Sequence, residues 1–195
     1  MDSSMNYFDN AKAIEIEAIK SISPLRGDSY VNQCINNLSE KLIKIDFSTE
    51  DWLENIPKSY GIYLFWVNLQ AWNNDIDVLK NEWVAAKELV KFVPRFNQAR
   101  SKRTGLRAKS DACLPFYLGK AEKLADRVKQ HVFIKPESGT YALKLGAMRK
   151  YNKKIYELGF YISHLEFPFS KKSAFLLEII EAALREKINP IIGRQ

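Results

Sequence analysis

The sequence predicts an α+β protein with a small central β-sheet, antiparallel or mixed, that is flanked by helices. Two short apolar runs, at residues 60–67 and 116–118, are rich in aromatic and β-branched residues and are typical of buried strands. A third run, at 160–167, alternates well enough for another strand. Between and after these runs lie segments with helical spacing, and the clearest of them, 169–188, closes the chain.

The first 57 residues are predicted to form a helical extension docked on the rest of the chain. Residues 9–22 and 30–45 carry apolar side chains at helical spacing, with a Pro- and Gly-containing break between them. Ser48 and Asp51 have the pattern of an N-cap pair that opens one more short turn. The side chains expected to face inward are Ala11, Ile14, Ala18, Ile19, Val31, Ile35, Leu38 and Leu42.

A long segment, 68–112, separates the first two predicted strands and is interpreted as a helical, basic insertion. Within it, residues 76–93 have the pattern of an amphipathic helix, which Pro94 ends. The run that follows contains no acidic residue, so it suits contact with a phosphate backbone, although a solvated loop is the alternative. The cations proposed to bind DNA are Arg95, Arg100, Lys102, Arg103, Arg107 and Lys109.

The second predicted strand passes directly into a charged, amphipathic helix, expected over residues 120–132. Apolar side chains recur every four residues on one of its faces, and Arg127 and His131 share another. Tyr117 stands on the strand and Lys120 at the turn. A helix amino terminus beside two fixed cations is a favourable place for a phosphate.

Composition narrows the classes of function. The 195 residues suit one domain with an extension or two small ones, and the net charge of +7 modestly favours a polyanionic partner. Cys34 and Cys113 lie far apart and outside any metal-ligand spacing, which favours a reducing, cytoplasmic setting over a disulfide framework or structural zinc. No apolar run approaches the ~20 residues of a membrane span, so no membrane partner is expected.

The two central strands carry the triplets Gly-Ile-Tyr at 61–63 and Tyr-Leu-Gly at 117–119. Together with the basic helix after the second triplet and the acidic residues on the last helix, they make the chain from about Tyr60 to Gly193 resemble the GIY-YIG nuclease family. Arg127 lies ten residues after the second tyrosine and His131 fourteen. The family keeps an essential arginine, and a histidine or tyrosine, at these offsets.

The resemblance implies an organisation and an activity. Residues 1–57 would be the N-terminal extension, and 58–195 a nuclease core with its insertion at about 68–112. The activity implied is that of a metal-dependent endonuclease that hydrolyses DNA phosphodiester bonds, as a stand-alone restriction or defence enzyme. Its substrate would be double-stranded DNA, and cutting both strands would require a homodimer or sequential nicking. A non-cleaving DNA-binding module and an RNA-directed nuclease remain as alternatives.

The resemblance also implies roles around the two triplets. Phosphodiester hydrolysis needs an activated water, charge neutralisation at the phosphate and a proton for the leaving oxygen. Tyr63 would be the general base on water, and Tyr117 would support the water or the phosphate. Lys120 would lower the pKa of the tyrosine, Arg127 would hold the scissile phosphate, and His131 would relay protons or bind phosphate.

The acidic residue on the last helix would hold the metal. Glu181 stands nine residues before Pro190, as the family's glutamate does before its proline, and would bind one Mg²⁺ or Mn²⁺ per active site. Glu178, three residues earlier, is the alternative ligand. The family's asparagine three residues after the proline is replaced here by Gly193, a departure that concerns phosphate or product positioning more than the metal.

Overall fold

A computed structural model of the chain describes residues 3–97, 113–148 and 159–193. Within them, an antiparallel four-stranded sheet with the order β1-β4-β2-β3 forms the centre, so the α+β class with a central antiparallel sheet is confirmed. The strands are β1 (Ile43–Lys44), β2 (Gly61–Asn68), β3 (Cys113–Ala121) and β4 (Phe160–Glu166). The helices are α1 (Ser3–Arg26), α2 (Asp28–Glu40), α3 (Ile76–Leu89), α5 (Leu124–Phe133), α6 (Leu145–Met148) and α8 (Phe175–Ile188), with 3₁₀ turns η1 (Asp51–Asn55), η2 (Leu69–Trp72) and η3 (Lys171–Ser173).

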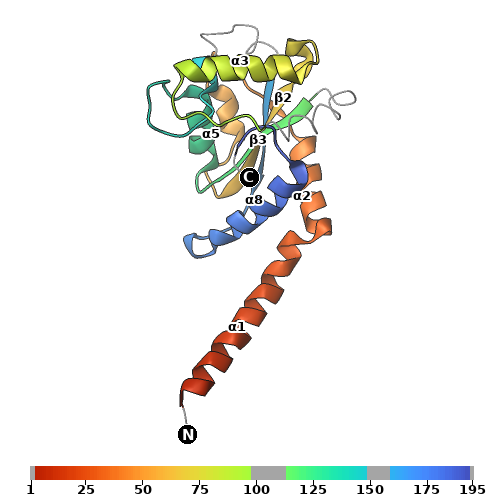
Figure 1. Cartoon of the computed structure of the whole chain (residues 1–195), viewed down its shortest axis with the longest axis vertical. Coiled ribbons are helices and arrows are strands. Elements are labelled where there is room, and N and C mark those ends of the chain that lie inside the picture. Colours follow the sequence, from red (N-terminus) through yellow and green to blue (C-terminus); the bar gives the residue numbers. More distant parts are fainter. Residues whose placement is uncertain (1–2, 98–112, 149–158, 194–195) are drawn as a thin grey trace.

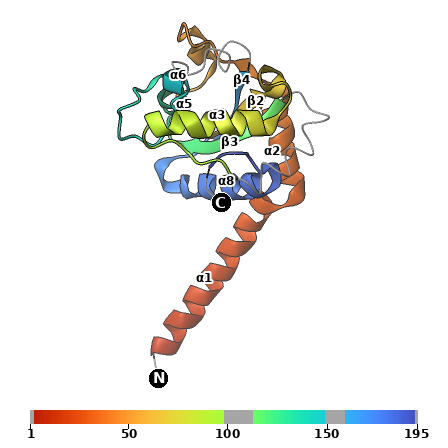
Figure 2. The same ribbon diagram turned by 45° about the horizontal axis from the view of Figure 1, so that its top comes forward.

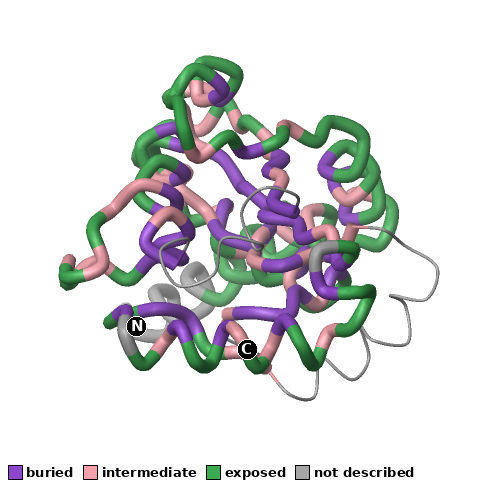
Figure 3. The backbone as a smooth tube through the Cα atoms, turned by 90° about the horizontal axis from the view of Figure 1, so that it is seen from above, coloured by how far each residue is buried: buried purple, intermediate pink, exposed green. Residues whose placement is uncertain are grey.

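Strand β2 is buried on both faces, because helices cover each side of the sheet. Its side chains alternate between two cores, as the pleat of a strand requires. Tyr63, Phe65 and Val67 enter a core with α3 and α5, whereas Ile62 and Leu64 enter a second core with α2 and α8. Figure 2 shows α3 and α8 on opposite sides of β3, and Figure 3 shows buried backbone through the centre of the molecule.

The beginning of the insertion is part of the core. Trp83 of α3 is only 2% exposed, donates its indole N–H to the carbonyl of Pro94, and packs edge-on against Phe116 of β3. The helix ends at Leu89, before the predicted limit, and its apolar residue Val84 is exposed. The insertion therefore supplies a layer that covers one face of the sheet.

The N-terminal region differs from its prediction. Helix α1 continues through Pro24 to Arg26, and Gly27 alone separates it from α2. Ile14 and Ile19, expected to face inward, are 68% and 59% exposed. Figure 1 shows the first part of α1 extending away from the globular body. The spacing predicted a helix correctly, but an amphipathic pattern does not say what the apolar face contacts.

The second predicted helix and the cap after it also need correction. Helix α2 ends at Glu40, and Ile43–Lys44 pair with β4 as the short edge strand β1. Ser48 bonds through its amide and hydroxyl to Asp46, and it does not cap η1. Val31 and Leu38 are buried against α8 as predicted, so α2 is docked, and Leu25 near the end of α1 packs against the same core.

The chain after α8 closes part of the outer edge of β3. The backbone N–H groups of Ile191 and Ile192 donate to the carbonyls of Pro115 and Phe116, and Ile192 pairs in parallel with Tyr117. This segment brings the C-terminal end of the described chain beside the second tyrosine triplet. Across the described ranges, no helix combines the length and apolarity of a bilayer span.

Candidate active site

Tyr63 is held in the core directly across from Gly119. The two residues face each other in the β2–β3 ladder, and a Cβ built on Gly119 would stand 2.3 Å from the Tyr63 hydroxyl oxygen. Side-chain atoms do not approach so closely, so the phenol occupies the space that the glycine leaves open. The glycine of the second triplet is thus a steric requirement of the tyrosine in the first.

His131 fixes the hydroxyl end of Tyr63. Its Nε2 lies 2.8 Å from the Tyr63 oxygen, and its Nδ1 accepts the backbone N–H of Leu143 at 2.9 Å. Because Nδ1 is an acceptor, the single proton of the neutral imidazole resides on Nε2 and is donated to the phenol oxygen. Burial, with the charge of Arg127 adding to it, holds the pKa of His131 well below its usual value.

This arrangement changes the expected role of His131. The ring is fully buried and both of its nitrogens are engaged, so it does not reach a phosphate, and neutral His131 does not accept the proton of Tyr63. A donor at the phenol oxygen instead favours the phenolate form of that tyrosine. The sequence signal for His131 was its spacing, one helical turn after Arg127, and this spacing does not show that the ring is buried.

Tyr117 completes an aromatic cluster at the edge of the sheet. Its ring centroid lies 6.3 Å from that of Tyr63 and 5.0 Å from that of His131. Burial raises the pKa of Tyr117, while the positive charges of Arg127 and Arg185 act in the opposite direction. The second tyrosine therefore lies partly buried between the core and two guanidinium groups.

Arg127 is oriented by bonds from both sides of its guanidinium. It donates to the side-chain oxygen of Gln130 and to the carbonyl of Tyr141, each at 2.8 Å. Burial is the main cause of the raised pKa of Tyr63, and the neighbouring Tyr117 adds to it. The charge and hydrogen bond of Arg127 offset part of this rise. A fixed cation thus lies beside both phenols.

Glu181 reaches the same cluster from α8. Burial dominates the raised pKa of Tyr63 and of Tyr117, and the negative charge of Glu181 contributes to both. Its carboxylate forms an ion pair with Arg185, whose guanidinium also donates to the carbonyl of Leu118 at 2.8 Å. The fold therefore brings Tyr63, Tyr117, Arg127 and Glu181 into one electrostatic environment.

Arg185 was not among the residues predicted for the site. It lies four residues after Glu181 on α8, so both face the outer edge of β3. Gly193, with φ +114°, lies against it: a Cβ there would be 3.1 Å from an Arg185 nitrogen and 3.4 Å from the Tyr117 ring. The Glu-x-x-x-Arg spacing was the available signal, and Gly193 occupies a place with little room for a larger residue.

Lys120 and Glu178 lie apart from this cluster. Lys120 belongs to β3, and because Gly119 faces Tyr63, the next side chain points to the opposite face of the sheet. There it pairs with Glu178 and lines a pocket with Phe175 of α8. Lys120 is not among the groups that influence the pKa of Tyr63, so the structure gives no support to its expected role.

The amino terminus of α5 is not the expected phosphate site. The helix begins at Leu124, not at residue 120, and the N–H groups of Leu124 and Ala125 donate to the carbonyls of Ser59 and Pro57. Because these donors are taken by the protein itself, they do not serve a ligand.

Of the six cations predicted to bind DNA, the structure describes only Arg95. Arg95 is exposed, and its carbonyl accepts the N–H of Gly193 at 3.4 Å, so it lies next to the end of the described chain. The other predicted DNA contacts, Arg100, Lys102, Arg103, Arg107 and Lys109, lie outside the described residues. Their role stays a prediction.

The residues at the cluster fit a hard cation held mostly by water. Among the described residues, no group of three or more His, Cys, Asp or Glu side chains lies together. A single carboxylate with waters and substrate phosphate is nevertheless a common Mg²⁺ arrangement. Arg185 engages one oxygen of Glu181, and a carboxylate has two. Glu181 can therefore contribute one ligand to such an ion.

Comparisons with models of known families, with curated proteins and with solved structures found no match to this chain. The geometry of the cluster thus carries the functional interpretation.

The buried, neutral state of His131 predicts a pH-dependent stability. Its folded-state pKa is lowered from an unfolded value of ~6.5, so the stabilisation is present above pH 6.5 and is lost as the pH falls below it. The slope for one such group is about 1.4 kcal/mol per pH unit. We expect urea unfolding at pH 7.5 and 5.5 to show this loss in the wild type and a smaller loss in His131→Gln.

His164 is the appropriate control, because its pKa is also lowered, mainly by burial, though its ring is only half-buried. His164→Gln should keep the part of the pH dependence that His131 causes. If His131→Gln lost as much stability between the two pH values as the wild type, the assigned tautomer and neutral state would be wrong.

Proposed function

We propose that this protein is a metal-dependent endonuclease of the GIY-YIG type that hydrolyses DNA phosphodiester bonds. The observation that supports this most strongly is the convergence of two phenols, a guanidinium and a carboxylate at the edge of β3. Tyr63, Tyr117, Arg127 and Glu181 come from two strands and two helices, and the sequence resemblance had selected all four. A purely structural role would not require four polar groups of these types at one edge.

Each group has a role that suits phosphodiester hydrolysis. Arg127 would bind a non-bridging oxygen of the phosphate and the charge that develops on it. Tyr117, partly buried beside it, would position the phosphate or the attacking water. Tyr63 would accept a proton from that water, with His131 and Arg127 stabilising its phenolate.

The metal and the strongly raised pKa of Tyr63 are connected. Burial opposes formation of the phenolate, so positive charge beyond that of Arg127 is needed for Tyr63 to act as a base at neutral pH. One Mg²⁺ or Mn²⁺ at Glu181 would supply this charge and a Lewis acid for the phosphate. Arg185 would hold the carboxylate in position.

The proposal extends to the substrate and the assembly. The net charge of +7 and the basic run favour DNA, double-stranded in the simplest case. One active site does not reach two antiparallel phosphates at once, so cutting both strands would require a homodimer or sequential nicking. Cys34 and Cys113 are free thiols, in keeping with a proposed cytoplasmic setting.

A second candidate is a module of the same fold that binds DNA without cutting it. The ion pair between Glu181 and Arg185 favours this alternative, because a carboxylate already neutralised by an arginine has less need of a metal. An RNA-directed nuclease would use the same groups. Cleavage assays with matched DNA and RNA strands distinguish these possibilities from the first.

The choice between Glu181 and Glu178 as the metal ligand gives a testable prediction. We expect Glu181→Ala to raise the Mg²⁺ concentration for half-maximal cleavage by about tenfold or more, because a direct ligand is lost. Glu178→Ala should leave that concentration nearly unchanged, since Glu178 pairs with Lys120 on the other face of the sheet. Metal titrations of plasmid cleavage, with EDTA as the blank, provide the measurement.

Glu186, an exposed acid later on α8, is the matched control for the loss of one negative charge. If Glu186→Ala raised the Mg²⁺ concentration for half-maximal cleavage as much as Glu181→Ala does, Glu181 would not be the metal ligand. DNA binding without cleavage in Mg²⁺ and in Mn²⁺ would instead favour the non-cleaving module.

A further inference from the structure

A pocket that combines aromatic and basic side chains lies beside the candidate active site. It is lined by Lys87, Phe92, Val93, Arg95, Tyr141 and Gly193. Phe92 and Tyr141 are 54% and 43% exposed, so both rings are open to solvent. None of the described residues that line the pocket is acidic. Its chemistry therefore suits a ligand that joins a flat ring to a negatively charged group.

Phe92 is held in position at a cost in backbone conformation. It has φ +57°, a left-handed conformation that bulky side chains rarely adopt. Lys144, itself at φ +54°, is buried, with its amine bonded to the carbonyls of Pro136 and Ser138 and 5.9 Å from the centre of the Phe92 ring. Strained conformations of this kind cluster at ligand-binding sites.

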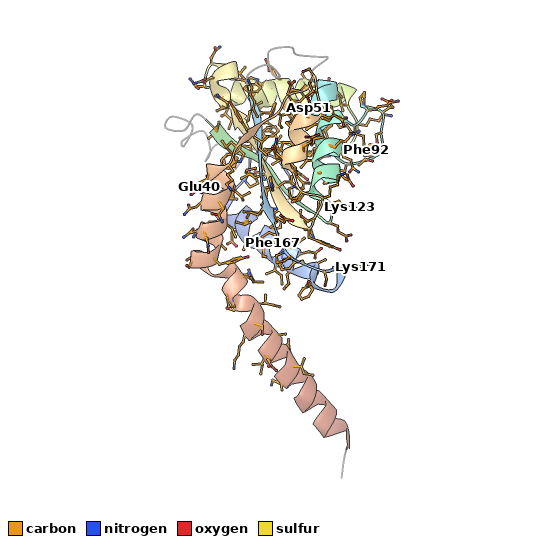
Figure 4. All side chains as sticks on the ribbon, turned by 180° about the vertical axis from the view of Figure 1, so that it is seen from behind. Glu40, Asp51, Phe92, Lys123, Phe167 and Lys171 are labelled. Atoms are coloured by element: carbon orange, nitrogen blue, oxygen red, sulfur yellow. The ribbon has the colours of Figure 1, made fainter. Side chains whose placement is uncertain are left out.

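The pocket is directly connected to the candidate active site. The carbonyl of Tyr141 accepts the guanidinium of Arg127, while the Tyr141 side chain lines the pocket. Gly193 lines the pocket from the other side and lies against the ring of Tyr117. In Figure 4, Phe92 lies on the same side of the body as Lys123, the residue before α5, and away from the end of α2 at Glu40. A nucleotide bound here would have its phosphate near Arg127.

We propose that this pocket binds an unpaired nucleobase of the DNA substrate, stacked against Phe92 and Tyr141, with Lys87 and Arg95 on its phosphates. The proposal rests on the proposed nuclease function and adds a preference for unpaired or distorted DNA next to the cut. Base stacking on an aromatic side chain tolerates any base, because each base has a π-face. The pocket would therefore recognise an extruded base and not a sequence.

The test is binding of labelled duplexes in EDTA, which prevents metal-dependent cleavage. Three probes share one sequence: a fully paired duplex, one with a single unpaired base, and one with an abasic residue at that place. We expect the unpaired-base probe to bind most tightly, and its advantage to fall about 5- to 100-fold in Phe92→Asn and in Tyr141→Ala. Asparagine tolerates the left-handed conformation, so this change removes the ring without adding backbone strain.

Val84→Ala, which shortens an exposed side chain of α3 outside the pocket, is the matched control and should bind all three probes like the wild type. 2-Aminopurine at the unpaired position gives a second readout, because stacking quenches its fluorescence, and this quenching should weaken in both pocket variants. Equal affinity of the wild type for the unpaired-base and abasic probes, or pocket variants that bind like the wild type, would overturn the proposal.

Cleavage of the same probes in Mg²⁺ separates this proposal from the proposed function. If the paired and the unpaired-base probes are cleaved at the same rate, the base-binding role of the pocket is wrong and the nuclease function still holds. Base-dependent binding that Phe92→Asn abolishes, without cleavage in any divalent metal, supports the pocket and contradicts the nuclease.

Discussion

Tyr63→Phe is expected to slow DNA cleavage by about 10²- to 10⁴-fold, the range for losing a general base, with little change in DNA binding. The substitution keeps the buried ring and removes only the hydroxyl that lies 2.8 Å from His131. Loss of this bond leaves the imidazole donor without its acceptor, which costs about 1–3 kcal/mol of stability. Single-turnover cleavage with enzyme in excess, beside circular dichroism and binding titrations, measures these effects separately.

Tyr161→Phe on β4 is the matched control, because it removes a tyrosine hydroxyl from the other core of the sheet. It should cleave at the wild-type rate. A Tyr63→Phe protein that is folded and cleaves within about threefold of the wild type would exclude Tyr63 as the base, because the loss would fall far below the general-base range.

Gly119→Ala is expected to impair both stability and cleavage, although it adds only one methyl group. That methyl would stand 2.3 Å from the Tyr63 oxygen, in a place where the phenol is enclosed by the core and bonded to His131. Overpacking of this kind costs about 1–3 kcal/mol. A displacement of ~1 Å at a catalytic group can cost about 10²-fold in rate. Urea unfolding and single-turnover cleavage of the same preparation test both effects.

Gly139→Ala is the control for replacing a glycine by alanine, because no atom lies within 4 Å of a Cβ built at that loop position. It should unfold and cleave like the wild type. If Gly119→Ala proved as stable and as active as Gly139→Ala, the close fit of Tyr63 against β3 would be wrong.

The sheet and its tyrosines could be predicted from the sequence, because both depend on local signals. The apolar run of β2 and the alternation of β4 are properties of short windows, and both strands form nearly as expected. Offsets within one strand and one helix then place Arg127 and His131 beside Tyr117. The spacing between residues within one helix stays the same even when the predicted start of the helix is wrong by a few residues. Helix α5 is an example, because it begins at Leu124 and was expected to begin at residue 120.

Other features depended on contacts that no local pattern encodes. Phe175 is apolar and lies at the start of α8, yet it is 53% exposed, whereas the buried positions of that helix are Leu177, Ile180, Ala183, Leu184 and Ile188. The bond from Leu143 to His131 joins segments whose pairing depends on the tertiary fold. The same holds for Arg185, whose guanidinium reaches β3 from α8.

A crystal structure with Mn²⁺ and a duplex blocked at the scissile phosphate by phosphorothioate substitution tests the central claim most directly. We expect anomalous scattering to place Mn²⁺ on the Glu181 carboxylate, with the phosphate between that ion and the guanidinium of Arg127, and Tyr63 and Tyr117 facing the same phosphate. Mn²⁺ bound away from Glu181, with the DNA backbone crossing another face of the protein, would contradict a common active site.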